Sequence, residues 1–206
     1  MQHMTPITIV DYGAGNLRTV QRAFEYVGAE AHITGDPDVV RQARKLVLPG
    51  VGAFGKAMER LRATHLDEAI RERVAEGVPL LGICLGLQLL FDESEELGRH
   101  EGLHLLPGRV RKFDISLKIP HIGWNEVRIQ REHPLVQGIA PGQFGYFVHS
   151  FYVDPADPEV VLATSDYEIE FACICARDHV MGIQFHPEKS QELGLALLRN
   201  FATFGE

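Results

Sequence analysis

Three residues of this chain have the types and spacing of a nucleophile with its base. Cys84 stands in the apolar run "GVPLLGICLGLQLLF" (77–91), between Gly82 and Gly86. Small residues two before and two after a reactive residue are typical of a nucleophile elbow, because larger side chains would collide across the turn between strand and helix. The helix N-terminus favours a thiolate and can donate to an oxyanion. We therefore expect Cys84 to be a nucleophile, with the glycines leaving room for the thiolate and for the substrate carbonyl.

The base expected for this nucleophile is His186, in "GIQFHPEKS" (182–190). Glu188 comes two residues later, so both side chains point to the same side of an extended backbone. Pro187 between them restricts φ and stiffens the pair. A carboxylate bound to one imidazole nitrogen turns the other toward the thiol. Without these partners, Cys84 would be interpreted as a small buried hydrophobic residue.

A glycine-rich loop offers backbone donors for the same chemistry. The segment "LPGVGAFG" (48–55) leaves the N–H groups of Gly50, Val51 and Gly52 free to approach a ligand, although it could also be an ordinary strand-to-helix turn. Together with the amide of Leu85, this loop could form an oxyanion hole.

The elements that must position these residues alternate between strand and helix in the first half of the chain. Strands are predicted at 7–12, 45–50 and 78–84, and helices at 16–28, 53–77 and 85–96. Such alternation predicts a parallel sheet with helices on both faces. The second half has short strand-like segments at 108–113, 121–129, 145–153, 160–165, 171–177 and 180–186, and a closing helix at 192–201. We expect one α/β domain over residues 1–206, with a mostly parallel mixed sheet.

Composition excludes several classes of function. The chain has 206 residues, a net charge of −8 and three cysteines. The negative charge argues against a general affinity for nucleic acid or anionic membranes, and three cysteines do not make a disulfide framework. The N-terminus has no basic region followed by a long apolar one, and the longest apolar run is too short to span a bilayer. We expect a cytoplasmic protein with free thiols.

The motifs together resemble the class I, or triad-type, glutamine amidotransferases, through "GICLGLQ" and "HPE". Within that family the chain is similar to the glutaminase subunits of imidazole glycerol phosphate synthase. The segments that carry this narrower resemblance are "VDYGAGNL" (10–17), "LPGVGAFG" (48–55), "GICLGLQLLF" (82–91), "KIPHIGWN" (118–125), "YFVHSFY" (146–152) and "QFHPEKSQ" (184–191).

The resemblance implies a mechanism and a partner. Cys84 would attack the side-chain amide of glutamine, releasing ammonia, and His186, held by Glu188, would activate the water that hydrolyses the thioester. The glutamine backbone end would be held by Gln88, His149, Ser150 and Phe151. The ammonia would pass to a cyclase subunit of (β/α)8-barrel type in a heterodimer, facing Asn16, Trp124, Tyr146 and Lys189. Because free ammonia is protonated and lost in water, and the motifs span residues 10–191, we expect the acceptor to be a second chain.

Three other functions remain open at this stage. Another class I enzyme component, such as that of anthranilate or aminodeoxychorismate synthase, shares the elbow but is disfavoured by "KIPHIGWN" and "HPEKSQ". A cysteine peptidase or γ-glutamyl hydrolase would act alone. A non-catalytic protein on the same fold is disfavoured by the intact set of Cys84, His186 and Glu188.

Two further motifs are set aside, and no metal or cofactor is expected. "HEGLH" (100–104) matches a zinc-protease pattern, but Gly102 and Pro107 leave no helix to present both histidines. "GAGNLR" (13–18) lacks the third glycine of a dinucleotide fingerprint. Cys173 and Cys175 share a strand face by simple alternation, and core packing is favoured over metal binding there.

Overall fold

The structure is a computed structural model that describes residues 4–206, so residues 1–3 of the expected domain lie outside the described part. Its helices are α1 (Leu17–Tyr26), α2 (Pro37–Val40), α3 (Phe54–Ala63), α4 (Leu66–Ala75), α5 (Leu85–Leu89) and α6 (Gln191–Ala202), with 3-10 turns at Pro134–Val136, Pro158–Val160 and Pro187–Lys189. Its strands are β1 (Ile7–Val10), β2 (Ala31–Thr34), β3 (Leu46–Gly50), β4 (Leu80–Cys84), β5 (Glu93–Ser94), β6 (His100–Glu101), β7 (Gly108–Lys112), β8 (His121–Ile129), β9 (Gln143–His149), β10 (Phe151–Pro155), β11 (Val161–Tyr167), β12 (Ile169–Arg177) and β13 (Val180–Ile183).

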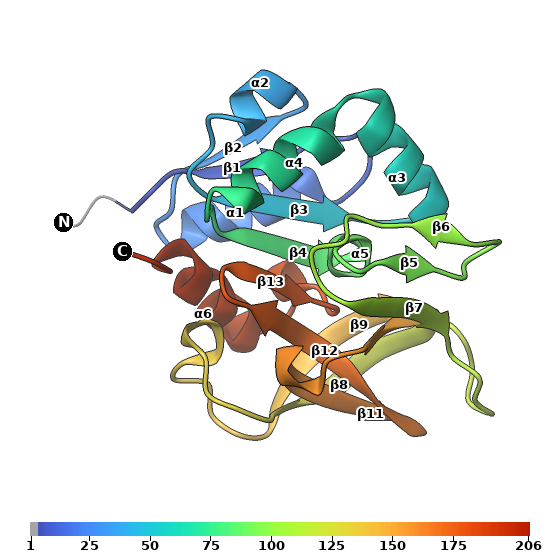
Figure 1. The fold of residues 1–206 in the computed structure, drawn as a ribbon. Helices are drawn as coiled ribbons and strands as arrows, with labels where there is room; N and C mark the ends of the chain where they lie inside the picture. Colours follow the sequence, from blue (N-terminus) through green and yellow to red (C-terminus); the bar gives the residue numbers. More distant parts are fainter. Residues whose placement is uncertain (1–3) are drawn as a thin grey trace.

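The sheet has a parallel half, which carries the predicted nucleophile. Strands β2, β1, β3, β4 and β13 lie side by side in that order and run parallel (Figure 1). β1, β3, β4 and β13 are buried at every position, which is the pattern of parallel strands covered on both faces. Because β4 and β13 are direct neighbours, the residues that follow them emerge at the same edge of the sheet.

The other half begins at β13 and is antiparallel except where β5 pairs with β7. From there the sheet continues through β12, β10, β7, β5 and β6, while a branch runs from β12 through β11 and β8 to β9. The expected mixed sheet with flanking helices is confirmed, with a larger antiparallel part than a mostly parallel sheet would have.

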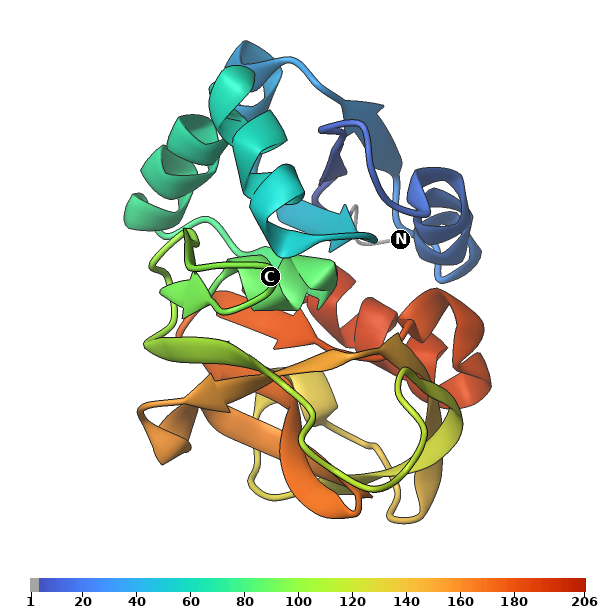
Figure 2. The ribbon, with the colours of Figure 1, turned by 90° about the vertical axis from the view of Figure 1, so that its right-hand side faces the viewer.

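Helices cover both faces of the parallel strands. α1 and α6 lie on one face, and α3, α4 and α5 on the other (Figures 1 and 2). Phe24 and Phe201 meet on the first face with ring centroids 6.2 Å apart, and Phe54 and Phe91 are fully buried on the second. Burying such side chains on both faces, each contributing roughly 2 kcal/mol, fixes the parallel strands between the two helical layers.

Three predicted elements differ from the structure. The helix expected over 53–77 is divided into α3 and α4 by His65, which has a left-handed φ of 57°. The strand-like segment 145–153 is divided at Ser150 into β9 and β10. The helix expected over 85–96 is only α5, because the amides of Leu103 and Leu105 bond the carbonyls of Leu89 and Leu90 at its end, and residues 93–94 form β5. β2 and α2 have no counterpart in the sequence prediction.

Cys173 and Cys175 are fully buried free thiols, as core packing predicts. They do not share a face, however: Cys173 packs in the core beside α1 and α6 and Cys175 in the core beside α3 and α4. Irregular register between β11 and β12 near these residues explains the difference, since a bulge breaks the simple alternation. No group of three or more possible metal ligands occurs within residues 4–206.

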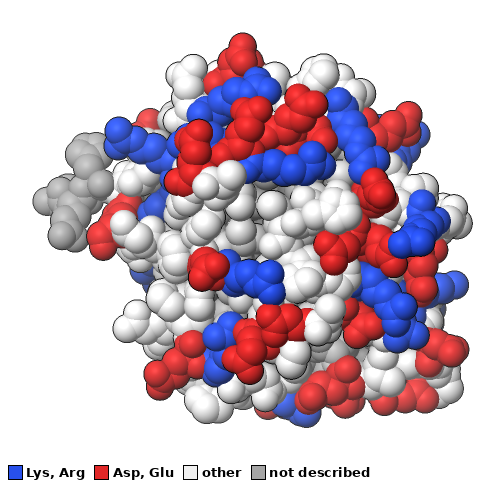
Figure 3. Space-filling model, in the orientation of Figure 1, with Lys and Arg blue, Asp and Glu red and all other residues white. Residues whose placement is uncertain are grey.

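The face of the molecule drawn in Figure 3 shows no expanse of a single charge. On the face in Figure 3, lysine and arginine side chains are interspersed with aspartate and glutamate. This distribution gives no positive stripe on that face for a phosphate backbone. Among the described residues, no helix is long and apolar enough to cross a membrane.

Candidate active site

Cys84 lies at a sharp turn between strand and helix, as predicted. It is the last residue of β4 and directly precedes α5, and its backbone has φ 56° and ψ −111°. Side-chain-bearing residues rarely adopt such a positive φ, which costs on the order of 1–3 kcal/mol. The residue is only 6% exposed, and it lines a cleft that opens at this edge of the sheet. The strained turn thus directs the thiol into a sheltered cleft.

The glycines around Cys84 make room for backbone. A Cβ on Gly82 would lie 2.6 Å from the carbonyl carbon and oxygen of Gly86, which is the collision across the turn that the sequence predicts. A Cβ on Gly86 would overlap the carbonyl oxygen of Leu48 in β3. These two glycines therefore let α5 pack against β3 and β4. The expectation that they clear space for substrate is corrected accordingly: the space that they leave is filled by backbone.

Replacing Gly86 with alanine is expected to destabilise the fold by about 3 kcal/mol or more, because backbone must move to admit the methyl group. Gly142→Ala is the control: its φ is +78°, but a Cβ there meets nothing within 4 Å, so we expect a loss of about 1 kcal/mol. Chemical denaturation of both variants measures the difference. Equal losses would show that the close approach of α5 to β3 is not the reason for Gly86.

His186 and Glu188 form a buried pair beside Cys84. β4 and β13 pair in register at Ile83 and Ile183, so the segment after β13 reaches the same edge as Cys84. The Nδ1 atom of His186 lies 2.8 Å from Oε1 of Glu188, and the Glu188 side chain is 1% exposed. Burial alone would lower the pKa of His186, but interactions with Cys84 and Glu188 raise it to about 10. The site therefore favours the protonated form of His186.

The cleft has a volume of about 320 Å³, within the range of small-molecule sites. Its lining includes the predicted residues Val51, Gly52, Cys84, Leu85, Gln88, His149, Ser150, Phe151 and His186. Gly50 does not line it, because it is the last residue of β3 and pairs with Cys84 in the sheet. Glu96, Pro120 and Val148 also line the cleft and were not predicted. Val51, Gly52 and Leu85 are thus the predicted oxyanion donors that lie along the cleft.

Two buried polar residues near the cleft were not predicted as site residues from the sequence. Gln184 is fully buried, and its Nε2 lies 3.9 Å from the sulfur of Cys84. Its signal was its place two residues before His186, with the same alternation that links His186 and Glu188. Tyr12 is 4% exposed, and its hydroxyl would touch a Cβ at Gly50, yet among residues 4–206 it has no hydrogen-bond partner. Burial, followed by the charge of Cys84, raises the pKa of Tyr12 well above its usual range.

His149 is held by protein groups on both ring nitrogens. Its Nδ1 bonds the carbonyl of Phe151 at 2.8 Å and its Nε2 lies 3.0 Å from Nδ1 of His121. Burial lowers the pKa of His149 to about 3 and that of His121 to about 4. Both rings are therefore neutral at pH 7, and His149 has no free nitrogen for glutamine.

These two histidines should make the fold sensitive to mild acid. Below pH 6.5 the unfolded chain protonates them while the folded chain does not until about pH 4, so stability falls as the pH drops. His186 does not offset this loss: its raised pKa stabilises the folded chain fully below pH 6.5, and to nearly the same extent at pH 7. We expect the free energy of unfolding to fall by on the order of 2–4 kcal/mol between pH 7 and pH 5. Chemical denaturation at pH 7 and at pH 5 tests this. An unchanged free energy of unfolding would contradict the burial of both histidines in their neutral form.

Of the four residues expected to face a partner, three lie together: Trp124, Tyr146 and Lys189. Trp124 and Tyr146 have ring centroids 5.7 Å apart, and Nζ of Lys189 lies 5.8 Å from the Tyr146 ring. Asn16 precedes α1 on a separate element and takes no part in these ring contacts. Trp124 is about half exposed.

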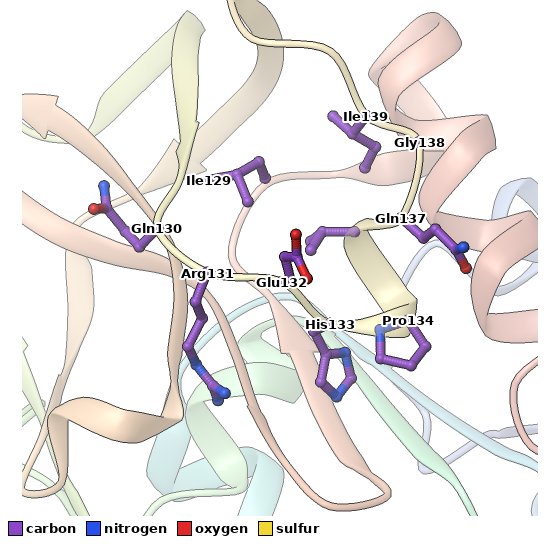
Figure 4. Close-up of a pocket in the computed structure, with 10 residues that line it drawn as sticks. Ile129, Gln130, Arg131, Glu132, His133, Pro134, Gln137, Gly138 and Ile139 are labelled. Carbon is purple, nitrogen blue, oxygen red and sulfur yellow. The ribbon is translucent and has the colours of Figure 1, made fainter.

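A larger hollow of about 730 Å³ lies elsewhere and is a weaker candidate. Its lining residues, between Ile129 and Ile139, come from the end of β8 and from the segment that joins β8 to β9 (Figure 4). It is therefore the inside of one loop, and it contains no nucleophile paired with a base. The chemistry favours the cleft at Cys84.

The chain is similar to known proteins along nearly its whole length. The family described as "Glutamine amidotransferase class-I" matches residues 8–203. The "Imidazole glycerol phosphate synthase subunit HisH" of Syntrophotalea carbinolica is 56% identical over 95% of this chain and 98% of the relative. The protein of the same description from Moorella thermoacetica is 51% identical over 96% of this chain and 94% of its own. The solved "Structure of PurLQS from Thermotoga maritima" has the same fold, with a TM-score of 0.77 at 18% identity, covering 96% and 97% of the two chains.

Proposed function

The chain belongs to the class I glutamine amidotransferase family, and we propose that Cys84, His186 and Glu188 are its catalytic triad. It hydrolyses glutamine to glutamate and ammonia as a subunit of imidazole glycerol phosphate synthase, in histidine biosynthesis. The observation that carries the triad is the strained elbow at Cys84 beside a buried histidine whose Nδ1 is 2.8 Å from a buried carboxylate.

The first half of the reaction forms a thioester. The Cys84 thiolate attacks the carboxamide carbon of glutamine, and the amides of Leu85 and of the Val51–Gly52 loop stabilise the oxyanion. The protonated His186 gives its Nε2 proton to the nitrogen, the C–N bond breaks and ammonia leaves. Glu188 keeps the imidazole turned toward the thiol throughout.

The second half releases glutamate. The neutral His186 takes a proton from water, and the resulting hydroxide attacks the thioester carbon. The second oxyanion occupies the same donors, the C–S bond breaks, and the thiolate returns beside the imidazolium. Ser150 and Phe151, which line the same cleft as Cys84, would hold the amino-acid end of the substrate.

The partner subunit is proposed to be a cyclase of (β/α)8-barrel type that docks on an exposed apolar patch. The patch consists of Ile122, Trp124, Phe144, Tyr146 and Val148. Register pairs Ile122 with Val148 and Trp124 with Tyr146, so these side chains share one face of the β8–β9 pair. Val148 also lines the cleft, so a partner on the patch would cover the cleft mouth and receive ammonia before water protonates it.

Trp124→Ala is expected to weaken binding of the partner subunit on the order of 100-fold, because large aromatic anchors carry much of an interface's binding energy. Leu97→Ala is the matched control, since Leu97 is 91% exposed and lies outside the patch. Isothermal titration with the purified partner measures both variants. Equal affinity for both would place the interface on another face.

The function as a whole is tested by glutamate release from glutamine. The purified chain is assayed alone and with the cyclase subunit and its nucleotide ligand. We expect low activity alone and strong stimulation in the pair. Equal activity in both conditions would retain the cysteine chemistry but favour a stand-alone γ-glutamyl hydrolase.

A further inference from the structure

A chain of hydrogen bonds runs from β8 to the wall of the cleft. Nδ2 of Asn125 lies 3.3 Å from Nε2 of His121, and Nδ1 of His121 lies 3.0 Å from Nε2 of His149. Nδ1 of His149 then reaches the carbonyl oxygen of Phe151 at 2.8 Å. His121 and His149 are 3% and 6% exposed, so water does not compete for these bonds. None of the roles assigned above uses His121.

The same carbonyl connects this chain to the nucleophile. Nε2 of Gln88 donates to the Phe151 oxygen and to Oε1 of Gln184, both at 3.1 Å. Nε2 of Gln184 lies 3.9 Å from the sulfur of Cys84. The Phe151 carbonyl therefore accepts from two sides and is fixed relative to Cys84.

The direction of the chain is fixed independently from both ends. A carbonyl can only accept, so the proton of His149 is on Nδ1 and its Nε2 is an acceptor. At the other end, Oδ1 of Asn125 accepts from the amide of Glu126, and Nδ2 donates to the carbonyl of Asp166. That Nδ2 can only donate to His121, so the proton of His121 is also on Nδ1, and it donates to His149. Both ends therefore require the Nδ1–H tautomer in His121 and His149, and every hydrogen bond of the chain then has one donor and one acceptor.

Packing prevents the rings from turning to another arrangement. The His121 ring is stacked against Tyr167 and Phe147, with ring centroids 4.0 Å and 4.9 Å away. Phe113 meets the edge of the His149 ring at 5.2 Å. The protein therefore holds both imidazoles in a single orientation.

We propose that His121 is a positioning residue for glutamine binding: it fixes His149 in the Nδ1–H tautomer that, with Gln88, holds the Phe151 carbonyl and the cleft wall that His149, Ser150 and Phe151 form. The inference rests on the proposed function, because that wall binds the amino-acid end of glutamine. His121 does not touch the reacting atoms, so its loss should act on substrate binding more than on chemistry.

The first test reads the tautomers directly in the folded chain. Two-bond 1H–15N correlation spectra at pH 7, with 15N-labelled histidine, distinguish Nδ1–H from Nε2–H rings. We expect Nδ1–H for both His121 and His149, and loss of the single tautomer of His149 in His121→Phe. An Nε2–H or doubly protonated ring at either position in the wild type would overturn the proposal, whatever the activity of the protein.

The second test separates binding from chemistry in the complex with the partner subunit. His121→Phe keeps an aromatic ring for stacking but cannot donate, and we expect KM for glutamine to rise on the order of tenfold, the scale of one buried hydrogen bond. The kcat should stay within about threefold of wild type. His121→Asn keeps a donor near the position of Nδ1 and should restore most of the lost affinity.

The outcomes distinguish the role of His121 from the proposed function. A wild-type complex that does not hydrolyse glutamine would contradict the proposed function. An active wild type with unchanged KM in His121→Phe, or with equal losses in the Phe and Asn variants, would overturn the role of His121. Should His121→Phe not fold, the tautomers of the wild type still decide the question.

Discussion

Cys84→Ala is expected to lower glutamine hydrolysis by at least about 10³-fold, because no other group in the cleft can form the thioester. The fold should be retained, since alanine fits where the thiol lies against the elbow. Binding of the partner subunit should be unchanged, because Cys84 lies inside the cleft and not on the apolar patch. Glutamate release under saturating glutamine, with the partner present, measures the effect.

Cys175→Ala is the matched control for this prediction. Cys175 is also a buried free thiol, but it packs in the core beside α3 and α4 and does not line the cleft. We expect this variant to keep its activity. Substantial glutaminase activity in Cys84→Ala would contradict the assignment of the nucleophile.

His186→Ala is expected to lower kcat by on the order of 10³-fold or more, and Glu188→Gln by less, because only His186 transfers a proton. An amide at position 188 can still accept from Nδ1 of His186 through its oxygen, but it removes the negative charge that helps to raise the pKa of the imidazole. Steady-state kinetics on both folded variants give the order.

The control for the charge change is Glu159→Gln, an exposed glutamate in the 3-10 turn before β11. Its kcat should match the wild type. A larger loss in Glu188→Gln than in His186→Ala would mean that Glu188 does more than orient the base.

The sequence predicted the parts of the site that are close in the chain. Gly82, Cys84 and Gly86 specify the elbow within five residues, and His186 and Glu188 are paired by the alternation of one extended segment. The strands β4 and β13 are each indicated by an apolar run, but their parallel pairing, which brings the two segments to the same edge, was not predicted. Local patterns of this kind can be predicted from the sequence because they depend on few distant contacts.

Features that depend on distant contacts could not be predicted in this way. The reason for Gly86 is the carbonyl of Leu48, in a strand far earlier in the chain. The tautomer of His121 depends on its hydrogen bond to His149, on the neighbouring strand β9. The end of α5 is set by amides of a later loop. The members of the Gly86–Leu48 and His121–His149 contacts lie far apart in the chain, so no short window of sequence contains both.

The covalent intermediate on Cys84 is the most direct test of the account. The complex is mixed with glutamine, quenched in acid within the turnover time and digested, and its peptides are weighed by mass spectrometry. We expect a mass increase of one glutamyl group on the peptide that contains Cys84, and no such increase in Cys84→Ala. Glutamate release with no glutamyl group on that peptide, or with the group on another residue, would contradict it.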